Sequence, residues 1–362
     1  MTARERVLRT FAHEKTDRVT IGYEANPGIH MRLAKALGIP DGDNERVRSE
    51  KVRQALGVDY RGVGAPYRGP PLFPERADRR VDRVDGFYTK WVAHKTGGYW
   101  DFCDFPLQNA DDEAIANYPV PSADDFDYGA AADALAGCGD NAVYIGHAGT
   151  GDIINSTGRV MGMEDTLVNL LTGHEATLAF TDRRLQLQLD ILERLLARCK
   201  GRIDFLWLGE DLGTQHAPMV SLELYRRVLR PRHQRFIDLA KAHGLPVQIH
   251  TCGSSSWAYE DFIGMGVTGV DTLQPEAANM SPRYLKETFG GRLTFRGCIS
   301  TAMLAFCSEE EVTQTVRETL GIMMPGGGYH FAPTHMIQDN TPVENVLAMY
   351  RAAHKYGVYQ EA

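Results

Sequence analysis

The feature that most constrains the fold of this chain is a repeated alternation of short apolar, β-branched runs with longer amphipathic stretches. Eight runs have the length and composition of β-strands, and most are followed by apolar residues at helical spacing. The predicted strands span residues 18–23, 58–63, 142–146, 203–208, 246–250, 269–273, 292–296 and 328–332. Eight βα units in a chain of 362 residues predict a (β/α)8 barrel, an α/β fold forming one domain over residues 1–362.

Helix signals support this alternation. Thr2 and Glu5 have the spacing of a capping box at the start of the first helix. A long helix is predicted where leucines recur at positions 185, 189, 192 and 196. The main alternative, a doubly wound open sheet, usually carries a Gly-rich phosphate-binding loop after its first strand. Residues 23–28, YEANPG, do not have that pattern, so the sequence favours the barrel.

One long segment interrupts the alternation after the second predicted strand. Residues 65–130 are irregular and rich in Pro, Gly, Asp and aromatic residues. Within them, residues 86–93 and 98–102 have the pattern of an antiparallel hairpin. We expect this insert, with the loop after the first strand, to lie near the mouth of the barrel and to shape substrate choice.

Composition excludes several classes of partner. The chain carries 39 Lys and Arg against 47 Asp and Glu, a net charge of −8, which argues against nucleic acid or an anionic membrane as a partner. No apolar run approaches the roughly 20 residues of a membrane span, and the first residues lack the apolar core of a signal peptide. We therefore expect a cytoplasmic protein whose six scattered cysteines are free thiols or metal ligands.

Barrels of this kind place their active sites at the C-terminal ends of the strands. The polar residues just after each predicted strand are therefore the candidates for function. They include Tyr23, Glu24, His147, Asn155, Glu210, Asp211, His250, Cys252, Gln274, Cys298 and His335. Of these we assign His147, Gln274 and Asn155 to substrate binding.

The sharpest local pattern is His250-x-Cys252. Residues i and i+2 of an extended chain point to the same side, so an imidazole and a thiolate can converge on one metal ion. Gly253 permits a sharp turn directly after the pair. The alternative is a buried cysteine beside a hydrogen-bonded histidine.

A zinc site needs at least a third protein ligand. The candidates are Cys298, whose alternative role is that of a small buried apolar residue, His335, which could instead act as an acid, a base or a substrate ligand, and Glu210. The adjacent carboxylates of Glu210 and Asp211 could also raise one pKa and supply a general acid. Alternatively, Asp211 caps a helix or forms a salt bridge.

The run Pro325-Gly326-Gly327-Gly328 invites comparison with a phosphate-binding loop. It lacks the Lys-Ser/Thr pair and the following helix that such a loop requires. The sequence favours a tight turn leading into the last strand.

Taken together, several motifs resemble one family. They are GEDLGTQ at 209–215, HTCG at 250–253, GCIST at 297–301, PGGGY at 325–329, His335, and Thr341-Pro342-x-Glu344-Asn345. The chain resembles the uroporphyrinogen decarboxylase (URO-D) superfamily, and within it the methyltransferase-like branch of zinc-dependent corrinoid/coenzyme M methyltransferases. The resemblance covers about residues 1–28 and 140–360, and it implies a distorted (β/α)8 barrel.

The resemblance separates two activities. Uroporphyrinogen decarboxylases hold substrate carboxylates with an Arg-rich loop after the first strand, and residues 23–28 contain no Arg, so that reaction is not expected. The methyltransferase branch binds zinc through a His-x-Cys pair and a later Cys in a Pro-Gly-Cys-Gly stretch. His250 and Cys252 match the pair, whereas the resemblance places Gly327 at the later position. The predicted metal ligands are therefore His250, Cys252 and Cys298, with His335 and Glu210 as substitutes.

The resulting hypothesis is a zinc-dependent methyl or alkyl transferase, or a demethylase, that activates a thiol or another small substrate. Glu210, Asp211, His335 and Tyr23 are the predicted catalytic residues, and a corrinoid protein or tetrahydrofolate is the expected methyl carrier. A metal-free decarboxylase or lyase using His335, Asp211 and Tyr23 is the alternative. A non-catalytic member that only binds a ligand is a third hypothesis. The resemblance also implies a homodimer.

Overall fold

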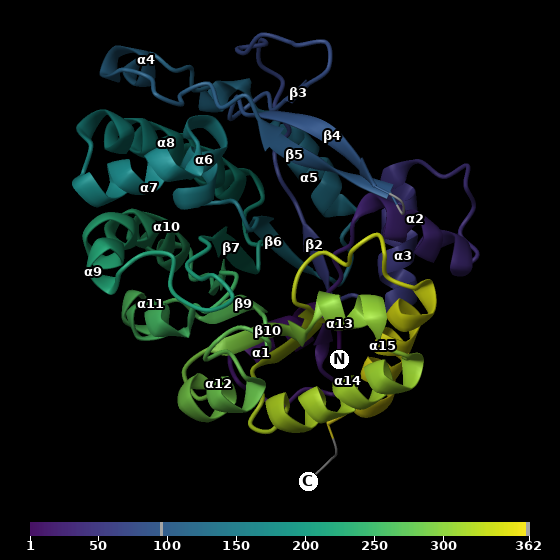
Figure 1. Ribbon diagram of the computed structural model, residues 1–362. Helices are drawn as coiled ribbons and strands as arrows, with labels where there is room; N and C mark the ends of the chain where they lie inside the picture. Colours follow the sequence, from purple (N-terminus) through teal and green to yellow (C-terminus); the bar gives the residue numbers. More distant parts are fainter. Residues whose placement is uncertain (95–96, 360–362) are drawn as a thin grey trace.

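Eight parallel strands form one sheet that curves into a nearly closed barrel (Figure 1). The computed structural model describes residues 1–94 and 97–359. The strand order is β1-β11-β10-β9-β8-β7-β6-β2, as a (β/α)8 barrel requires. The strands are β1 Thr20–Ile21, β2 Tyr60–Gly62, β6 Ala142–Gly146, β7 Phe205–Gly209, β8 Val247–His250, β9 Gly269–Leu273, β10 Thr294–Ile299 and β11 Tyr329–Pro333. Each overlaps one of the eight predicted strands, so the predicted fold is confirmed.

Helices surround the sheet and bury its outer face (Figure 1). They are α1 Ala3–Phe11, α2 Pro27–Ala36, α3 Glu45–Leu56, α6 Ile154–Met161, α7 Met163–Thr172, α8 Glu175–Arg198, α9 Leu222–Leu224, η2 Tyr225–Leu229, α10 Arg230–Ala242, η3 Ser256–Ala258, α11 Tyr259–Met265, α12 Pro282–Phe289, α13 Thr301–Phe306, α14 Glu309–Met323 and α15 Val343–Tyr356. The predicted capping box of Thr2 and Glu5 starts α1, and the leucine-patterned helix is α8. Across the described residues, no helix combines the length and apolarity that crossing a bilayer requires.

A buried carboxylate bridges the seam between β1 and β2. The backbone N–H of Asp59 donates to the carbonyl of Ile21 at 2.9 Å, and the N–H of Ile21 donates to Asp59 Oδ2 at 2.7 Å. Arg6 and Arg18 donate to the same carboxylate at 2.6 and 2.8 Å, and its side chain is 1% exposed. Among the described residues, β1 and β2 are not paired by a regular ladder of backbone hydrogen bonds. Asp59 therefore connects these two ends of the sheet.

Strand β10 runs further than predicted, to Ile299 rather than residue 296. Arg296 pairs with Asp271 and Gly297 pairs with Leu273, so the strand β9 contributes one extra residue, Thr272, at a bulge. In the sequence, Gly297 interrupts the apolar pattern, so the predicted strand ends before it. In the structure the strand continues through Gly297, whose φ is +118°. Cys298 consequently lies inside β10 and not after its end.

The insert forms a separate three-stranded antiparallel sheet with short helices. Its strands are β3 Arg80–Val81, β4 Tyr88–His94 and β5 Gly97–Cys103, and its helices are α4 Asp112–Ala116, η1 Ala123–Asp125 and α5 Tyr128–Ala136. The predicted hairpin is confirmed, except that residues 95–96 lie outside the described part of the chain. Figure 1 shows the insert in blue, with α4 beside α8.

The glycine run before β11 is a tight turn, as predicted. Gly326, Gly327 and Gly328 all have φ between 73° and 76°, a region that favours glycine. A Cβ on Gly327 would lie 2.9 Å from the carbonyl oxygen of His13. The turn precedes β11, so it lies at the N-terminal end of the barrel, opposite its mouth.

We expect Asp59→Ala to lower the free energy of unfolding by about 3–5 kcal/mol, because it leaves two largely buried guanidinium groups without their shared partner. Urea denaturation of wild type and variant measures the loss. Glu193→Ala, which removes an exposed carboxylate of α8, is the control and should change stability by less than about 0.5 kcal/mol. A loss at Asp59 no larger than that of the control would contradict the role of Asp59 at the seam.

Candidate metal centre

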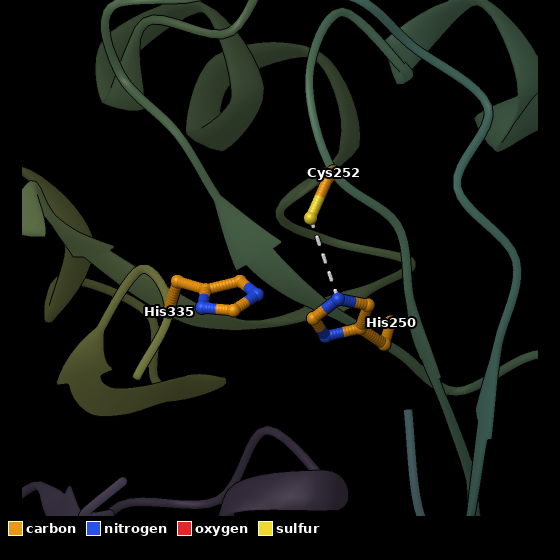
Figure 2. A group of neighbouring side chains, drawn as sticks. All are labelled: His250, Cys252 and His335. Carbon is orange, nitrogen blue, oxygen red and sulfur yellow. Dashed lines mark hydrogen bonds between the residues drawn. The ribbon is translucent and has the colours of Figure 1, made fainter. Parts of the chain in front are cut away.

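Three potential metal ligands converge at the mouth of the barrel (Figure 2). His250 is the last residue of β8, Cys252 follows it by two residues, and His335 follows the end of β11 by two. Their donor atoms all lie within 4.8 Å of one another, and Cys252 Sγ is 3.4 Å from His250 Nε2. Two strands separate β8 from β11 in the sheet, so the curvature of the barrel brings these residues together.

The chemistry of this donor set fits a catalytic zinc ion. Imidazole nitrogen and thiolate sulfur are ligands that zinc prefers. Three protein ligands leave a fourth position for water or substrate, which distinguishes catalytic from structural zinc sites. His335 is exposed and Cys252 is half-buried, so the open side of the cluster is accessible from the mouth.

Groups behind His250 fix its orientation. Asp271 Oδ2 lies 3.2 Å from His250 Nδ1, and Thr272 Oγ1 lies 2.6 Å from the same nitrogen. An ionised carboxylate only accepts hydrogen bonds, so Nδ1 keeps its proton, and Nε2 is the ring nitrogen that faces the cluster and would bind a metal on losing its own proton. Burial opposes protonation of His250, but its bonds to Asp271 and Cys252 raise its pKa well above the ordinary value in the metal-free protein.

Asp271 is itself held by a buried cation. Arg296 donates to Asp271 at 2.6 Å and to Glu24 at 2.7 Å, and its guanidinium lies 4.9 Å from the centre of the Trp207 ring. Burial alone would raise the pKa of Asp271, yet the charge of Arg296 and the bond to His250 lower it to about 2. The carboxylate behind His250 is therefore ionised at neutral pH.

A second set of bonds holds the loop that carries Cys252. Asp211 accepts from the backbone N–H of Cys252 at 2.8 Å, and Asn155 donates to its other oxygen at 2.8 Å. Gln274 accepts from the N–H of Gly253 at 2.7 Å. Gly253 has φ +70°, and a Cβ there would lie 2.2 Å from the carbonyl oxygen of Gly213, so the predicted sharp turn is confirmed.

The carboxylate of Asp211 also faces the cluster. Its Oδ1 lies 3.7 Å from His250 Nε2. Burial would raise its pKa, but the charge of His250 and the hydrogen bonds from Cys252 and Asn155 lower it below the ordinary value. Asp211 is thus an ionised acceptor beside the ligands, while Asn155 and Gln274, which were predicted to bind substrate, hold the loops.

Glu210 faces away from the cluster. Its carboxylate is fully buried, accepts from the N–H groups of Ile153 and Ile154 at the start of α6, and lies 3.1 Å from His233 Nε2. Burial raises its pKa to about 8. The structure therefore places Glu210 as an anchor of α6 rather than beside the predicted ligands.

Cys298 is not part of the group that the structure brings together. It is 2% exposed within β10, and burial raises the pKa of its thiol. Among the described residues, His335 and not Cys298 lies with His250 and Cys252 in the group that could hold a metal ion. The turn containing Gly327 lies before β11, whereas a ligand must follow that strand, so Gly327 does not stand at the ligand position.

A cavity of about 520 Å³ adjoins the cluster inside the mouth. Trp207, Arg296 and Met336 line it, together with Tyr23 and His147, two of the predicted site residues. The hydroxyl of Tyr23 lies 2.9 Å from His30 Nδ1, and burial raises its pKa. A further cavity of about 590 Å³ is lined by His335, by Gln274 and by Tyr99 of the insert hairpin, so the insert reaches the barrel mouth.

Sequence reasoning missed Asp271, Thr272 and Arg296 as parts of the site. Asp271 and Arg296 are charged residues within otherwise apolar strands, and a buried charge requires a partner. Asp271 pairs in register with His250 across β8 and β9. Charged residues inside predicted parallel strands were therefore the available signal.

Comparison with known proteins gives a family match for part of the chain and a similar fold for nearly all of it. Residues 207–356 match the family model described as uroporphyrinogen decarboxylase (URO-D), and this segment contains the whole ligand cluster. The chain is similar in structure to a methyltransferase from Methanosarcina mazei, with a TM-score of 0.68 and 17% identity over 98% of this chain and 99% of that one. No curated protein sequence matches the chain. The structural likeness shows a shared fold, and the family match confirms the predicted URO-D resemblance for the C-terminal segment.

We expect Glu210→Gln to change how stability depends on pH. The folded-state pKa of Glu210, about 8, lies above its ordinary value of 4.5, so its contribution is present at low pH and lost as pH rises through 8. His233, whose pKa is lowered to about 4, is neutral in the folded and unfolded states from about pH 7 to about pH 9. Over that window the wild type should lose about 1 kcal/mol relative to E210Q.

Urea denaturation at several pH values measures this difference, with Glu193→Gln as the control. Parallel stability profiles for wild type and E210Q would show that Glu210 is ionised in the folded protein.

Proposed function

We propose that this chain, whose C-terminal segment matches the URO-D family, is a zinc-dependent methyl or alkyl transferase that acts on a thiol at the barrel mouth. The observation that carries the proposal is the convergence of His250, Cys252 and His335, with Asp271 behind the first of them. The similar fold of the Methanosarcina mazei methyltransferase supports the same reaction class.

In this proposal, the residues of the site either bind the metal ion or orient the residues that bind it. His250 Nε2, Cys252 Sγ and one ring nitrogen of His335 would hold the ion. His335, predicted both as a catalytic residue and as a substitute ligand, is a ligand in this proposal. When bound, zinc would lower the pKa of a substrate thiol so that the thiolate persists at neutral pH. Asp271 and Thr272 fix the ring of His250 throughout.

Asp211 is the residue best placed to receive the proton of the thiol. It is ionised, faces the cluster, and is held by Asn155 and the N–H of Cys252. In the transfer, the sulfur forms a bond to the alkyl carbon while the bond from that carbon to its carrier breaks, and its electron pair stays with the carrier. The proposed carrier is a corrinoid protein, with tetrahydrofolate as the alternative.

The metal-free decarboxylase or lyase has less support from the geometry. That reaction would use His335, Asp211 and Tyr23 together. The hydroxyl of Tyr23 is bonded to His30, and His335 lies with the potential ligands. Activity that survives complete chelation would restore this alternative.

We expect the purified protein to contain about one equivalent of zinc per chain, as three ligands with an open position require. Elemental analysis after gel filtration measures it. H250A, C252A and H335A should each lose most of the metal, because each substitution leaves only two protein ligands for the ion.

Cys298→Ala is the matched control, since it removes a buried cysteine outside the cluster, and it should retain the metal. Loss of zinc from C298A together with retention in H335A would show that the ligand set predicted from the sequence is the correct one.

We expect Thr272→Ala to weaken zinc binding about 10-fold, because it removes a hydroxyl that orients His250. Thr272→Ser keeps the hydroxyl and should bind zinc like the wild type. Competition with a chromophoric chelator measures both affinities. Equal weakening in the two variants would show that the methyl group, and not the hydroxyl, matters at this position.

A further inference from the structure

A third cavity lies between the insert and the helices α6 and α8, away from the ligand cluster. Its volume is about 400 Å³. One wall is formed by leucine and isoleucine side chains of α8, such as Leu187 and Ile191, and the opposite wall includes Phe87 and Val120 of the insert. We call it the insert cavity. It shares His147 with the barrel-mouth cavity and includes none of the three potential metal ligands.

Two side-chain hydrogen-bond acceptors that line the cavity are already engaged by backbone groups of the protein. Gln188 Oε1 accepts from the N–H of Gly151 at 2.7 Å, and His147 Nδ1 accepts from the N–H of Gly149 at 2.9 Å. These bonds leave the amide N–H groups of Gln188 and the Nε2–H of His147 as donors. Both residues therefore offer donors to a ligand.

The two carboxylates on the wall also have partners. Asp85 Oδ1 accepts from Arg184 at 2.7 Å. Asp82 Oδ1 accepts from the N–H groups of Val84 and Asp85 at 2.9 and 2.8 Å, which fixes the turn before β4. Asp85 is therefore paired with a cation, and Asp82 is bonded to the backbone of the turn.

The cations on the wall are less completely satisfied. Arg184 is 6% exposed, and its Nε has no hydrogen-bond partner although it is buried. Arg159 is half-buried, and its guanidinium lies 5.7 Å from the ring centre of Phe87 and 5.1 Å from that of Phe102. Within residues 1–94 and 97–359, no carboxylate forms an ion pair with Arg159. A partly desolvated cation of this kind favours an anionic partner.

We infer that the insert cavity binds a small carboxylate with an apolar body. The donors of Arg159, Gln188 and His147 and the unpartnered Nε of Arg184 suit acceptor oxygens, and the aliphatic and aromatic walls suit an apolar group beside them. Asp82 and Asp85 also line the cavity and disfavour a dianion such as a phosphate monoester. The inference does not rest on the proposed methyl transfer, because none of the three potential metal ligands lines this cavity.

Isothermal titration of chelator-treated protein with phenylacetate tests the inference without involving metal. We expect saturable binding at one site per chain. Phenylacetamide, which keeps the shape without the charge, and acetate, which lacks the apolar body, should each bind at least about 10-fold more weakly, as the loss of one good interaction implies.

Variants locate the site. Arg159→Gln should weaken phenylacetate binding at least about 10-fold, and Ile191→Trp should abolish it by filling the cavity. Arg198→Gln, at the exposed end of α8, and His250→Ala, in the ligand cluster, should leave it unchanged. The thermal melting profile of each variant establishes that it is folded.

Three results would overturn the inference. They are no binding by the wild type, equal binding of phenylacetate and phenylacetamide, and binding that is lost in H250A but kept in R159Q and I191W. The last result would place the ligand at the barrel mouth. Loss of zinc in the cluster variants bears only on the proposed function, so the two proposals fail separately.

Discussion

The buried carboxylate of Asp271 connects the stability of the barrel with the chemistry at its mouth. It lies between Arg296 and His250, which ends β8. Arg296 also donates to Glu24, which follows β1. A buried charge of this kind is tolerated only when it is paired and hydrogen-bonded. The pairing that allows Asp271 to be buried is the same one that presents His250 Nε2 to the other ligands.

Curvature of the sheet supplies the rest of the site. His250 and His335 follow strands with two others between them, and only a closed or nearly closed sheet turns both side chains inward. The bulge at Thr272 places its hydroxyl 2.6 Å from His250 Nδ1, the ring nitrogen that also faces Asp271. Thr272 has φ +66°, a conformation that a β-branched side chain rarely adopts. Strain at this position is consistent with a functional role.

The fold and two of the three potential ligands could be predicted from the sequence, and there are physical reasons why the third could not. The eight strands follow from local apolar patterns, and the pairing of His250 with Cys252 follows from the two-residue repeat of an extended chain. The third ligand could not be predicted in the same way. Cys298 and His335 both lie near strand ends in the sequence, and their positions depend on the bulge between β9 and β10 and on barrel closure. Glu210 and Asp211 are adjacent, yet they face α6 and the cluster respectively.

The most direct test of this account is the X-ray absorption fine structure of the zinc-loaded protein, which counts the sulfur and nitrogen neighbours of the ion. The account predicts one sulfur, from Cys252, and two imidazoles, from His250 and His335, with the sulfur count rising by one when a substrate thiol is added. Two protein sulfurs before thiol is added would contradict the ligand set. An unchanged sulfur count after a saturating thiol is added would contradict thiol activation at this site.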